Sequence, residues 1–269
     1  MANVSKERAI KGHVYMAVES FAAGFQSRHE REVDDPEGTL NMKIHNVFIA
    51  ALGPEIQYYT ALVRSLDSSL GNVLERLAIN IAGLSFDVKK SVEGPLTTRQ
   101  TEKIANLLER YKRREKAPEV KDYAFLREQP GTQDARTKRH DSDYYLTDQE
   151  AGGHYLIELK IGGDLDNKKA RSEKEALLEQ FAILSNTVPK AREMRIYFAT
   201  AYNRYGEGQP WRQERVRQFF AAEELLIGKD FWNFICRSDT GYDTVLGAYK
   251  ERAHLILKAL NSIKETYLG

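Results

Sequence analysis

Two short segments of the chain hold acidic and basic side chains at a spacing that suits phosphodiester chemistry. The first contains Asp141 and Asp143, and the second contains Glu158 and Lys160. Side chains alternate faces along a strand, so the two residues of each pair share a face. A hairpin centred between residues 150 and 151 would place Asp143 opposite Glu158 and Asp141 opposite Lys160, with Cβ atoms about 4.5–5.5 Å apart. Two carboxylates that close repel each other unless a cation lies between them, and hard oxygen ligands suit Mg²⁺.

Lys160 adds the second part of this chemistry. Beside a metal, a lysine could orient or help to deprotonate the attacking water, and it could stabilise negative charge at phosphorus. The alternative is a surface hairpin on which Glu158 and Lys160 form an exposed ion pair. The opposite face of the segment is wholly apolar, which indicates a central strand, where polar side chains need a reason to be present; it consists of Tyr155, Ile157, Leu159 and Ile161.

An acid on one strand followed by Glu-x-Lys on the next resembles the signature of the PD-(D/E)xK nucleases. The turn and basic helix start at residues 162–169, and the upstream segment 69–75, resemble type II restriction endonucleases of that superfamily in particular. The resemblance implies Asp143 and Glu158 as metal ligands and Lys160 as the residue that positions the water. No proline precedes either aspartate, so Asp141 remains the alternative to Asp143.

The same resemblance implies what the protein does and what it binds. We expect Mg²⁺-dependent hydrolysis of double-stranded DNA at a short recognition sequence, within a restriction–modification system of a prokaryotic cytoplasm. A homodimer is expected, because two-fold protein symmetry mirrors a palindromic target. The alternatives are a structure-specific or repair nuclease of the same fold, a DNA-binding protein without cleavage, and a protein in which the motif is accidental.

Two further polar residues are candidates for the same site. Glu75 lies on a predicted helix next to small residues at positions 71, 78 and 82, so another element can approach closely there. Gln180 lies on the helix after Lys160, where some nucleases of the superfamily place a glutamine near the scissile phosphate. The alternatives are a glutamate at the edge of an ordinary amphipathic helix and a solvent-facing glutamine.

Candidate DNA-binding residues follow the catalytic segment. Arginine pairs bidentately with guanine and asparagine with adenine, so Asn203, Arg204, Arg212 and Arg215 have the right types to read bases. The basic helix start adds Lys168 and Lys169. The alternative for the residues after position 200 is an ordinary basic loop and helix start.

The net charge of +1 and the pI of about 7.8 argue against a dedicated DNA-binding domain, which is usually strongly basic. The charge is nevertheless uneven. Residues 103–116 contain six Lys or Arg against two Glu, and residues 190–217 contain seven against three. Each stretch could neutralise phosphates, or could simply be a solvated helix face.

Hydrophobic periodicity predicts the elements that must position these residues. Helices are expected at residues 6–25, 40–52, 55–82 and 98–115, then a polar loop at 128–140. Strands are expected at 143–146, 154–161 and 194–199, with a helix at 167–184, and mostly helix from 212 onward with breaks at Gly228 and Gly241. The order predicts an α/β (α+β) fold with a small mixed sheet and helical elaborations at both ends. We expect one domain at 1–269, with a helical part (1–118), a catalytic core (119–200) and a helical DNA-recognition part (201–269).

Several other classes are disfavoured. The single cysteine, Cys236, rules out an intrachain disulfide or a cysteine zinc cluster. No signal peptide or membrane-spanning stretch is expected. Neither a phosphate-binding P-loop nor a GxGxxG motif occurs, so no nucleotide cofactor is expected.

Overall fold

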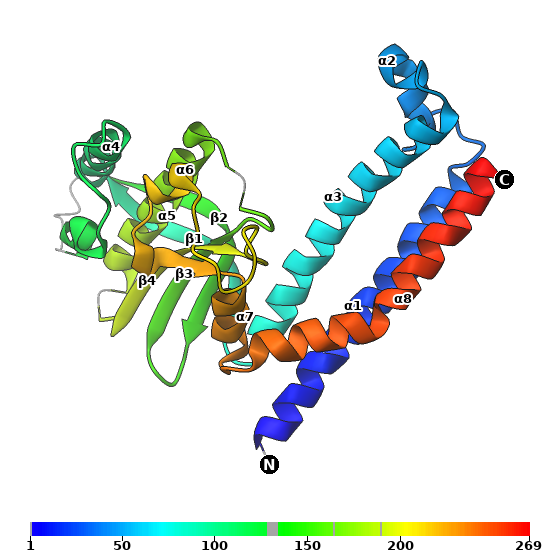
Figure 1. The fold of residues 1–269 in the computed structure, drawn as a ribbon. Helices are drawn as coiled ribbons and strands as arrows, with labels where there is room; N and C mark the ends of the chain where they lie inside the picture. Colours follow the sequence, from blue (N-terminus) through cyan, green and yellow to red (C-terminus); the bar gives the residue numbers. More distant parts are fainter. Residues whose placement is uncertain (1, 128–133, 164, 189) are drawn as a thin grey trace. The chain divides into compact units, whose positions relative to one another are not determined.

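The computed structural model describes residues 2–127, 134–163, 165–188 and 190–269 (Figure 1). The chain divides into two compact units. The helical unit comprises Met1–Ile81 and Asp243–Gly269, and the sheet unit comprises Ala82–Tyr242. These boundaries differ from those of the three parts predicted from the sequence, and the single domain at 1–269 stays a prediction.

The sheet unit contains a five-stranded mixed sheet. Its strands lie in the order β1 (Asp87–Thr97), β2 (Ala135–Asp148), β3 (Gly153–Leu159), β4 (Glu193–Thr200) and β5 (Leu225–Ile227). The pairings β1–β2 and β2–β3 are antiparallel, whereas β3–β4 and β4–β5 are parallel. The small mixed sheet predicted from the sequence is confirmed, and β3 is its central strand.

Helices pack against the two faces of this sheet. On one face, Tyr145, Leu156 and Phe198 share a buried core with residues of α5 (Asn167–Thr187). On the other face, Phe234 of α7 (Lys229–Cys236) contacts Tyr155, with ring centroids 5.2 Å apart. Because Glu158 is two residues beyond Leu156, its side chain lies on the α5 face.

The hairpin between β2 and β3 has the predicted register. Tyr144 pairs with Ile157 and Leu146 with Tyr155, and the next residues along the two strands are Asp143 and Glu158, where Asp143 Oδ2 accepts a hydrogen bond from Leu159 N at 3.2 Å. The turn is held by Asp148, whose Oδ1 accepts hydrogen bonds at 3.0 Å from the backbone N–H groups of residues 150 and 151. Asp and Glu next to glycines at the turn are what predicted this hairpin.

The first strand pair differs from the prediction. The loop expected at 128–140 is wrong for residues 135–140, which belong to β2 and pair with β1, a strand that the hydrophobic pattern did not predict; residues 128–133 lie outside the described ranges. β1 is an edge strand with charged side chains, and only Val92, Leu96 and Thr97 along it are buried. Gly94 allows α5 to approach, since a Cβ there would lie 2.7 Å from Thr187 Cγ2.

The predicted helices are mostly present, with shifted ends. The helical unit contains α1 (Ala2–Arg31) and most of α3 (Pro54–Ala82) and α8 (Gly241–Leu268); α4 (Thr98–Lys112), α6 (Glu214–Arg217) and α7 belong to the sheet unit. The helix expected at 40–52 is instead η1 (Asn41–His45) followed by the short α2 (Val47–Ala50), because Asn46 caps a new helix there. Short 3-10 segments η2 (Val120–Arg127) and η4 (Ala222–Glu224), and strand β5, were not predicted.

Side-chain caps mark the first turns of α4 and α5. Thr97 Oγ1 accepts a hydrogen bond from Gln100 N at 3.1 Å, and Gln100 Oε1 accepts one from Thr97 N at 3.1 Å, which forms a capping box for α4. Asp166 Oδ1 accepts a hydrogen bond from Lys169 N at 2.8 Å and caps α5. These caps set where each helix starts relative to the sheet.

A buried ion pair joins α5 to η4. Lys174 is 0% exposed, and its Nζ donates to both carboxylate oxygens of Glu224 at 2.6 Å. Glu224 also accepts hydrogen bonds from the Tyr123 hydroxyl at 2.8 Å and from Ala221 N at 2.7 Å. A fully partnered buried pair of this kind fixes the geometry of the elements that carry it.

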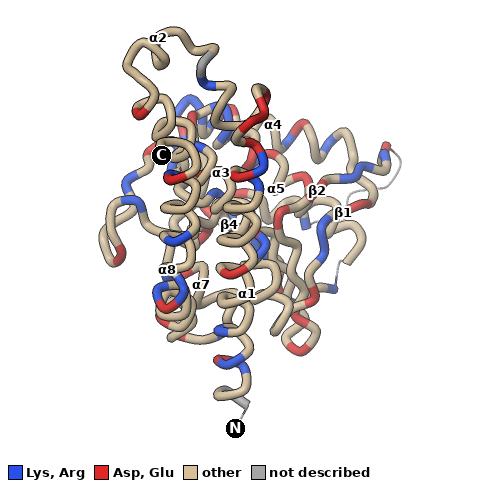
Figure 2. The backbone as a smooth tube through the Cα atoms, turned by 90° about the vertical axis from the view of Figure 1, so that its right-hand side faces the viewer, with Lys and Arg blue, Asp and Glu red and all other residues tan. Residues whose placement is uncertain are grey.

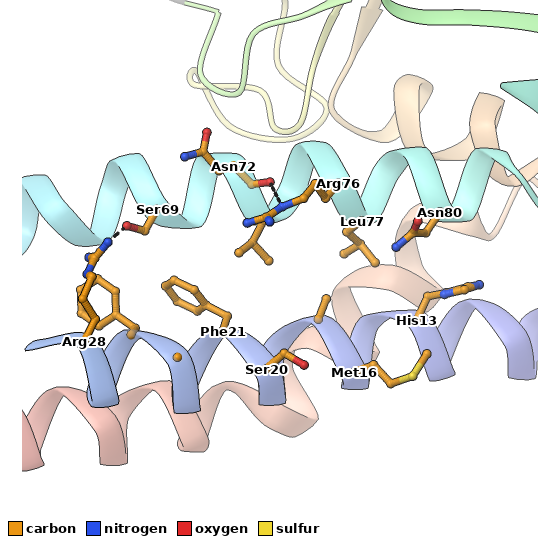
Figure 3. A pocket seen from close by; sticks show the side chains of 14 residues that line it. His13, Met16, Ser20, Phe21, Arg28, Ser69, Asn72, Arg76, Leu77 and Asn80 are labelled. Carbon is orange, nitrogen blue, oxygen red and sulfur yellow. Dashed lines mark hydrogen bonds between the residues drawn. The ribbon is translucent and has the colours of Figure 1, made fainter. Parts of the chain in front are cut away.

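The helical unit pairs α1 with α8 and α3. Gln26 donates to Ser262 at 3.1 Å, and Arg28 donates to Ser65 at 2.8 Å. A groove of about 600 Å³ lies between α1 and α3, with Phe21 and Leu77 among its apolar residues and Arg28 near Ser69 (Figure 3). No helix in the described ranges is long and apolar enough to cross a membrane. Basic and acidic residues are interspersed along the chain (Figure 2).

Candidate active site

The carboxylates of Asp143 and Glu158 meet on the α5 face of the sheet, where β2 is irregular. The β1–β2 register shifts between Lys89 and Ser91, opposite the part of β2 that contains Asp143. Bulges of this kind re-aim side chains and are common next to active sites. Asp143 is exposed, and its Oδ2 accepts a hydrogen bond from Leu159 N at 3.2 Å. That bond ties the aspartate to the segment between Glu158 and Lys160.

Glu158 is held in an environment that disfavours its charge. Its side chain is only 13% exposed, and Lys160 Nζ donates a hydrogen bond to its Oε1. Burial and the nearby charge of Asp143 raise the pKa of Glu158 from 4.5 to about 8, although Lys160 opposes the shift. The positive charge of Lys160 alone is therefore not sufficient to keep both carboxylates ionised.

Lys160 is positively charged in this arrangement. Burial lowers the pKa of Lys160, but the attraction of Glu158 and Glu173 outweighs burial and leaves the pKa above its ordinary value. Its Nζ lies 3.2 Å from Glu173 Oε1. The lysine thus has one acidic partner on the central strand and a second on α5.

Glu173 is the site residue that the sequence reasoning missed. It lies in the second turn of α5, half-buried, with its side chain 25% exposed. The signal was the helix that follows Glu-x-Lys, because such a helix must pack back across the sheet and bring one of its polar positions to the lysine. Polar residues on an amphipathic helix are usually solvated, so Glu173 did not stand out.

The carboxylate pair fits a divalent cation. In the described ranges no group of three or more His, Cys, Asp or Glu side chains is arranged to hold a metal ion. Mg²⁺, however, keeps several waters and is typically held by one or two carboxylates together with substrate phosphate. A cation between Asp143 and Glu158 would relieve the repulsion that raises the pKa of Glu158.

The structure separates the two candidate aspartates. The side chain of Asp141 is 93% exposed, and its Oδ1 lies 3.8 Å from Arg139 Nε. In the sheet, Asp141 pairs with Ser91 of β1. Asp143 is the one that contacts Leu159 N and whose charge acts on Glu158. The arrangement favours Asp143 as the ligand, with Asp141 in a surface ion pair.

The two second-rank residues have different surroundings. Gln180 is only 2% exposed, so the solvent-facing alternative is wrong, and its Oε1 has no hydrogen-bond partner among the described residues. Its neighbour Glu179 binds Lys138 Nζ at 2.6 Å and lies 2.8 Å from His140 Nε2. Glu75 is half-buried on α3 in the helical unit. A catalytic role for Glu75 or Gln180 stays a prediction.

The loop at residues 202–211, which contains the base-reading candidates Asn203 and Arg204, packs directly on the glycines that follow Lys160. Gly163 has φ +63°, and a Cβ there would collide with the Trp211 ring and lie 2.7 Å from Thr200 Cγ2. A Cβ on Gly162 would lie 2.7 Å from the Tyr202 hydroxyl. Gly163 N also donates to Lys160 O at 3.0 Å. The loop at 202–211 is thereby placed next to Lys160.

The individual DNA-binding candidates differ in availability. Arg204, Arg212 and Arg215 are exposed, and the Arg212 guanidinium lies 5.7 Å from the centre of the Tyr205 ring. Asn203 is buried: its Nδ2 donates to Gln209 O at 2.7 Å, and its Oδ1 accepts from Tyr205 N at 3.0 Å. These bonds favour a role for Asn203 in holding the loop.

The two lysines at the start of α5 are also available. Lys168 and Lys169 are both exposed in the first turn of the helix, whose N-terminus binds anions favourably. Asp164 lies outside the described residues. DNA contact by any of these side chains stays a prediction.

Comparison with known proteins identifies the family. The family described as type II restriction endonuclease, HinfI, matches residues 7–253. No curated protein and no solved structure matches the chain. The matched residues include the β2–β3 hairpin, α5 and the loop that packs on Gly163. The chain belongs to the HinfI family of type II restriction endonucleases and is a site-specific, DNA-hydrolysing enzyme.

Proposed function

We propose that Asp143 and Glu158 hold Mg²⁺ and that Lys160 positions the nucleophilic water for hydrolysis of double-stranded DNA. The observation that carries this proposal is the pair of facing carboxylates, one of which has its pKa raised to about 8 by burial and by the other. Groups with strongly perturbed pKa values, set by burial and a specific charged partner, are typical of functional sites.

Side chains of this protein supply most of the proposed site. A bound Mg²⁺ would supply electrostatic stabilisation at phosphorus and acidify the attacking water. If Glu158 held the cation, Lys160 would still have Glu173 as a partner, whose Oε1 lies 3.2 Å from its Nζ. Glu173 therefore serves as a positioning residue that holds the ammonium group beside the scissile phosphate, where it stabilises negative charge.

The family supports double-stranded DNA as the substrate, and the two-fold symmetry of a palindromic target supports a second copy of the chain as the partner. Arg204, Arg212 and Arg215 are the exposed candidates for reading bases or binding phosphates, with Lys168 and Lys169 at the anion-binding end of α5. The enzyme acts as a homodimer on a palindromic site, since a two-fold axis gives each strand one catalytic hairpin. It works in the prokaryotic cytoplasm, where incoming DNA meets a restriction–modification system.

The test is a digest of unmethylated phage DNA by purified protein, with Mg²⁺ and with EDTA, separated on a gel. Discrete bands that disappear with EDTA and in Lys160→Ala support the proposal, and their ends define the target. A smear or slow nicking supports the structure-specific alternative instead. Full cleavage by Lys160→Ala, or full cleavage in EDTA, contradicts the proposed roles.

A further inference from the structure

The end of the basic stretch 103–116 and the last part of the basic stretch 190–217 meet on one side of the sheet unit. Gln218, which follows α6, donates from Nε2 to the backbone oxygens of Tyr111 at 3.2 Å and Lys112 at 2.9 Å, at the end of α4. We propose that the C-terminal end of α4 and the segment 212–217 form one surface that binds the phosphate backbone of duplex DNA outside the recognised bases. The inference rests on the proposed function and extends it to the DNA that flanks the target.

A common core holds the two elements in place. Tyr111 of α4 and Val216 of α6 are both buried and belong to the same hydrophobic cluster. With these apolar positions turned inward, the basic positions are exposed: Arg110, Lys112, Arg113, Arg114, Arg212, Arg215 and Arg217. The surface therefore does not depend on a flexible tail, and its charges are presented by packed segments.

The charge of this surface is only partly balanced by the protein. Lys112 and Arg113 share Glu109, at 3.6 and 3.2 Å, and Arg217 lies 3.2 Å from Glu214. Among the described residues, Arg110, Arg114 and Arg215 are in no ion pair. Exposed ion pairs contribute about 0–1 kcal/mol each, so a phosphate can replace their carboxylates at little cost.

The surface continues from the catalytic segment. Trp211 packs on Gly163, and Gly163 N donates to Lys160 O at 3.0 Å. Arg212 follows Trp211 directly, and Gln218 then connects this segment to α4. A duplex whose scissile phosphate lies at Lys160 thus has basic residues beside it along the chain from Arg212 onward. This continuity favours DNA over an acidic protein as the occupant.

The test compares how wild type and variant bind flanking DNA. Once the digest has mapped the target, two fluorescent duplexes are made: one with minimal flanks, and one with about 10 further base pairs, roughly one helical turn, on each side. Binding is measured in EDTA over a range of salt concentrations for wild type and for Arg110→Gln/Arg114→Gln. These two arginines lie outside the proposed catalytic and base-reading residues.

The plot of log K against log salt has a negative slope, and each lost phosphate contact reduces the magnitude of that slope by about 0.9. We expect the double variant to lose most of the affinity gained from the flanks, to show a slope on the long duplex smaller by about 2, and to bind the short duplex as wild type does. The matched control is Lys190→Gln/Arg192→Gln. Both are exposed, and Arg192 N donates to Gly152 O at 3.2 Å, at the end of β3 opposite to Glu158.

Thermal unfolding of both double variants checks that the fold is retained. An unchanged slope and unchanged flank dependence in Arg110→Gln/Arg114→Gln overturn the inference, as does an equal loss in the control. If wild type still cuts at discrete sites, only this inference fails and the proposed function stands. A wild-type protein that cuts no DNA contradicts the proposed function itself.

Discussion

Glu158→Gln should make the metal-free protein more stable while it removes cleavage. In the folded chain the pKa of Glu158 is about 8, against an ordinary value of 4.5. Below about pH 4.5 both folded and unfolded states are protonated, and the shift costs nothing. Between the two values the unfolded state releases the proton and the folded state keeps it, so the free energy of unfolding falls as the pH rises.

The magnitude follows from the size of the shift. Each pH unit in this interval costs about 1.4 kcal/mol, so about 3 kcal/mol is lost between about pH 5 and pH 7. Glutamine cannot ionise, so Glu158→Gln avoids this loss. The gap in stability between variant and wild type should therefore widen by about that amount over the same interval.

Urea denaturation in EDTA, followed by circular dichroism at several pH values, measures this gap. Asp141→Asn is the matched control, because it makes the same acid-to-amide change on a neighbouring side chain that is 93% exposed. Mg²⁺ should stabilise wild type and leave Glu158→Gln unchanged, since a ligand that binds the folded state alone raises stability. A gap that stays constant with pH, or a variant stabilised by Mg²⁺ as much as wild type, refutes the reasoning.

Three further substitutions test other parts of the structure. Lys174→Met should lower the free energy of unfolding, measured in urea, by about 3–5 kcal/mol, because it leaves Glu224 buried without its cation. Lys174→Met/Glu224→Gln should cost less than the sum of the two single changes. A cost below about 1 kcal/mol for Lys174→Met contradicts this. Gly163→Ala should lower the melting temperature more than Gly208→Ala does. Both glycines have positive φ, but a Cβ at position 163 would collide with Trp211, whereas a Cβ at position 208 would meet open space. Equal losses would show that the collision with Trp211 is unimportant. Glu173→Gln should slow single-turnover cleavage without changing the Mg²⁺ concentration that gives the half-maximal rate. Glu175→Gln, on the same helix, should cleave at the wild-type rate. A shifted Mg²⁺ requirement in Glu173→Gln would make Glu173 a ligand instead.

The catalytic hairpin was predictable because strand periodicity and turn chemistry both specify it. A two-residue period places Glu158 and Lys160 on one face, and the acidic, glycine-containing turn sets the register that brings Asp143 opposite Glu158. Because a slip of one residue would turn the apolar face of β3 to the wrong side, the register is strongly specified. That is why the pair proposed as metal ligands could be named from the sequence, with Asp141 as the alternative to Asp143.

β1 could not be predicted in the same way. It is an edge strand that contains Lys89, Lys90, Gly94 and Pro95, so it lacks the apolar alternation of a buried strand. Its pairing with residues 135–141 is a long-range contact that local pattern does not encode. Glu173 and Gln218 were missed for a related reason: their partners, Lys160 and the end of α4, are determined by how helices pack on the sheet.

The most direct test of the proposed metal site compares Asp143→Asn with Asp141→Asn in single-turnover cleavage of a labelled duplex that carries the mapped target. We expect Asp143→Asn to slow cleavage by about a hundred-fold or more, because several kcal/mol of charge stabilisation are lost with a ligand, and Asp141→Asn to cut at close to the wild-type rate. The reverse result, or wild-type cleavage by Asp143→Asn, would contradict the assignment of the metal site to Asp143 and Glu158.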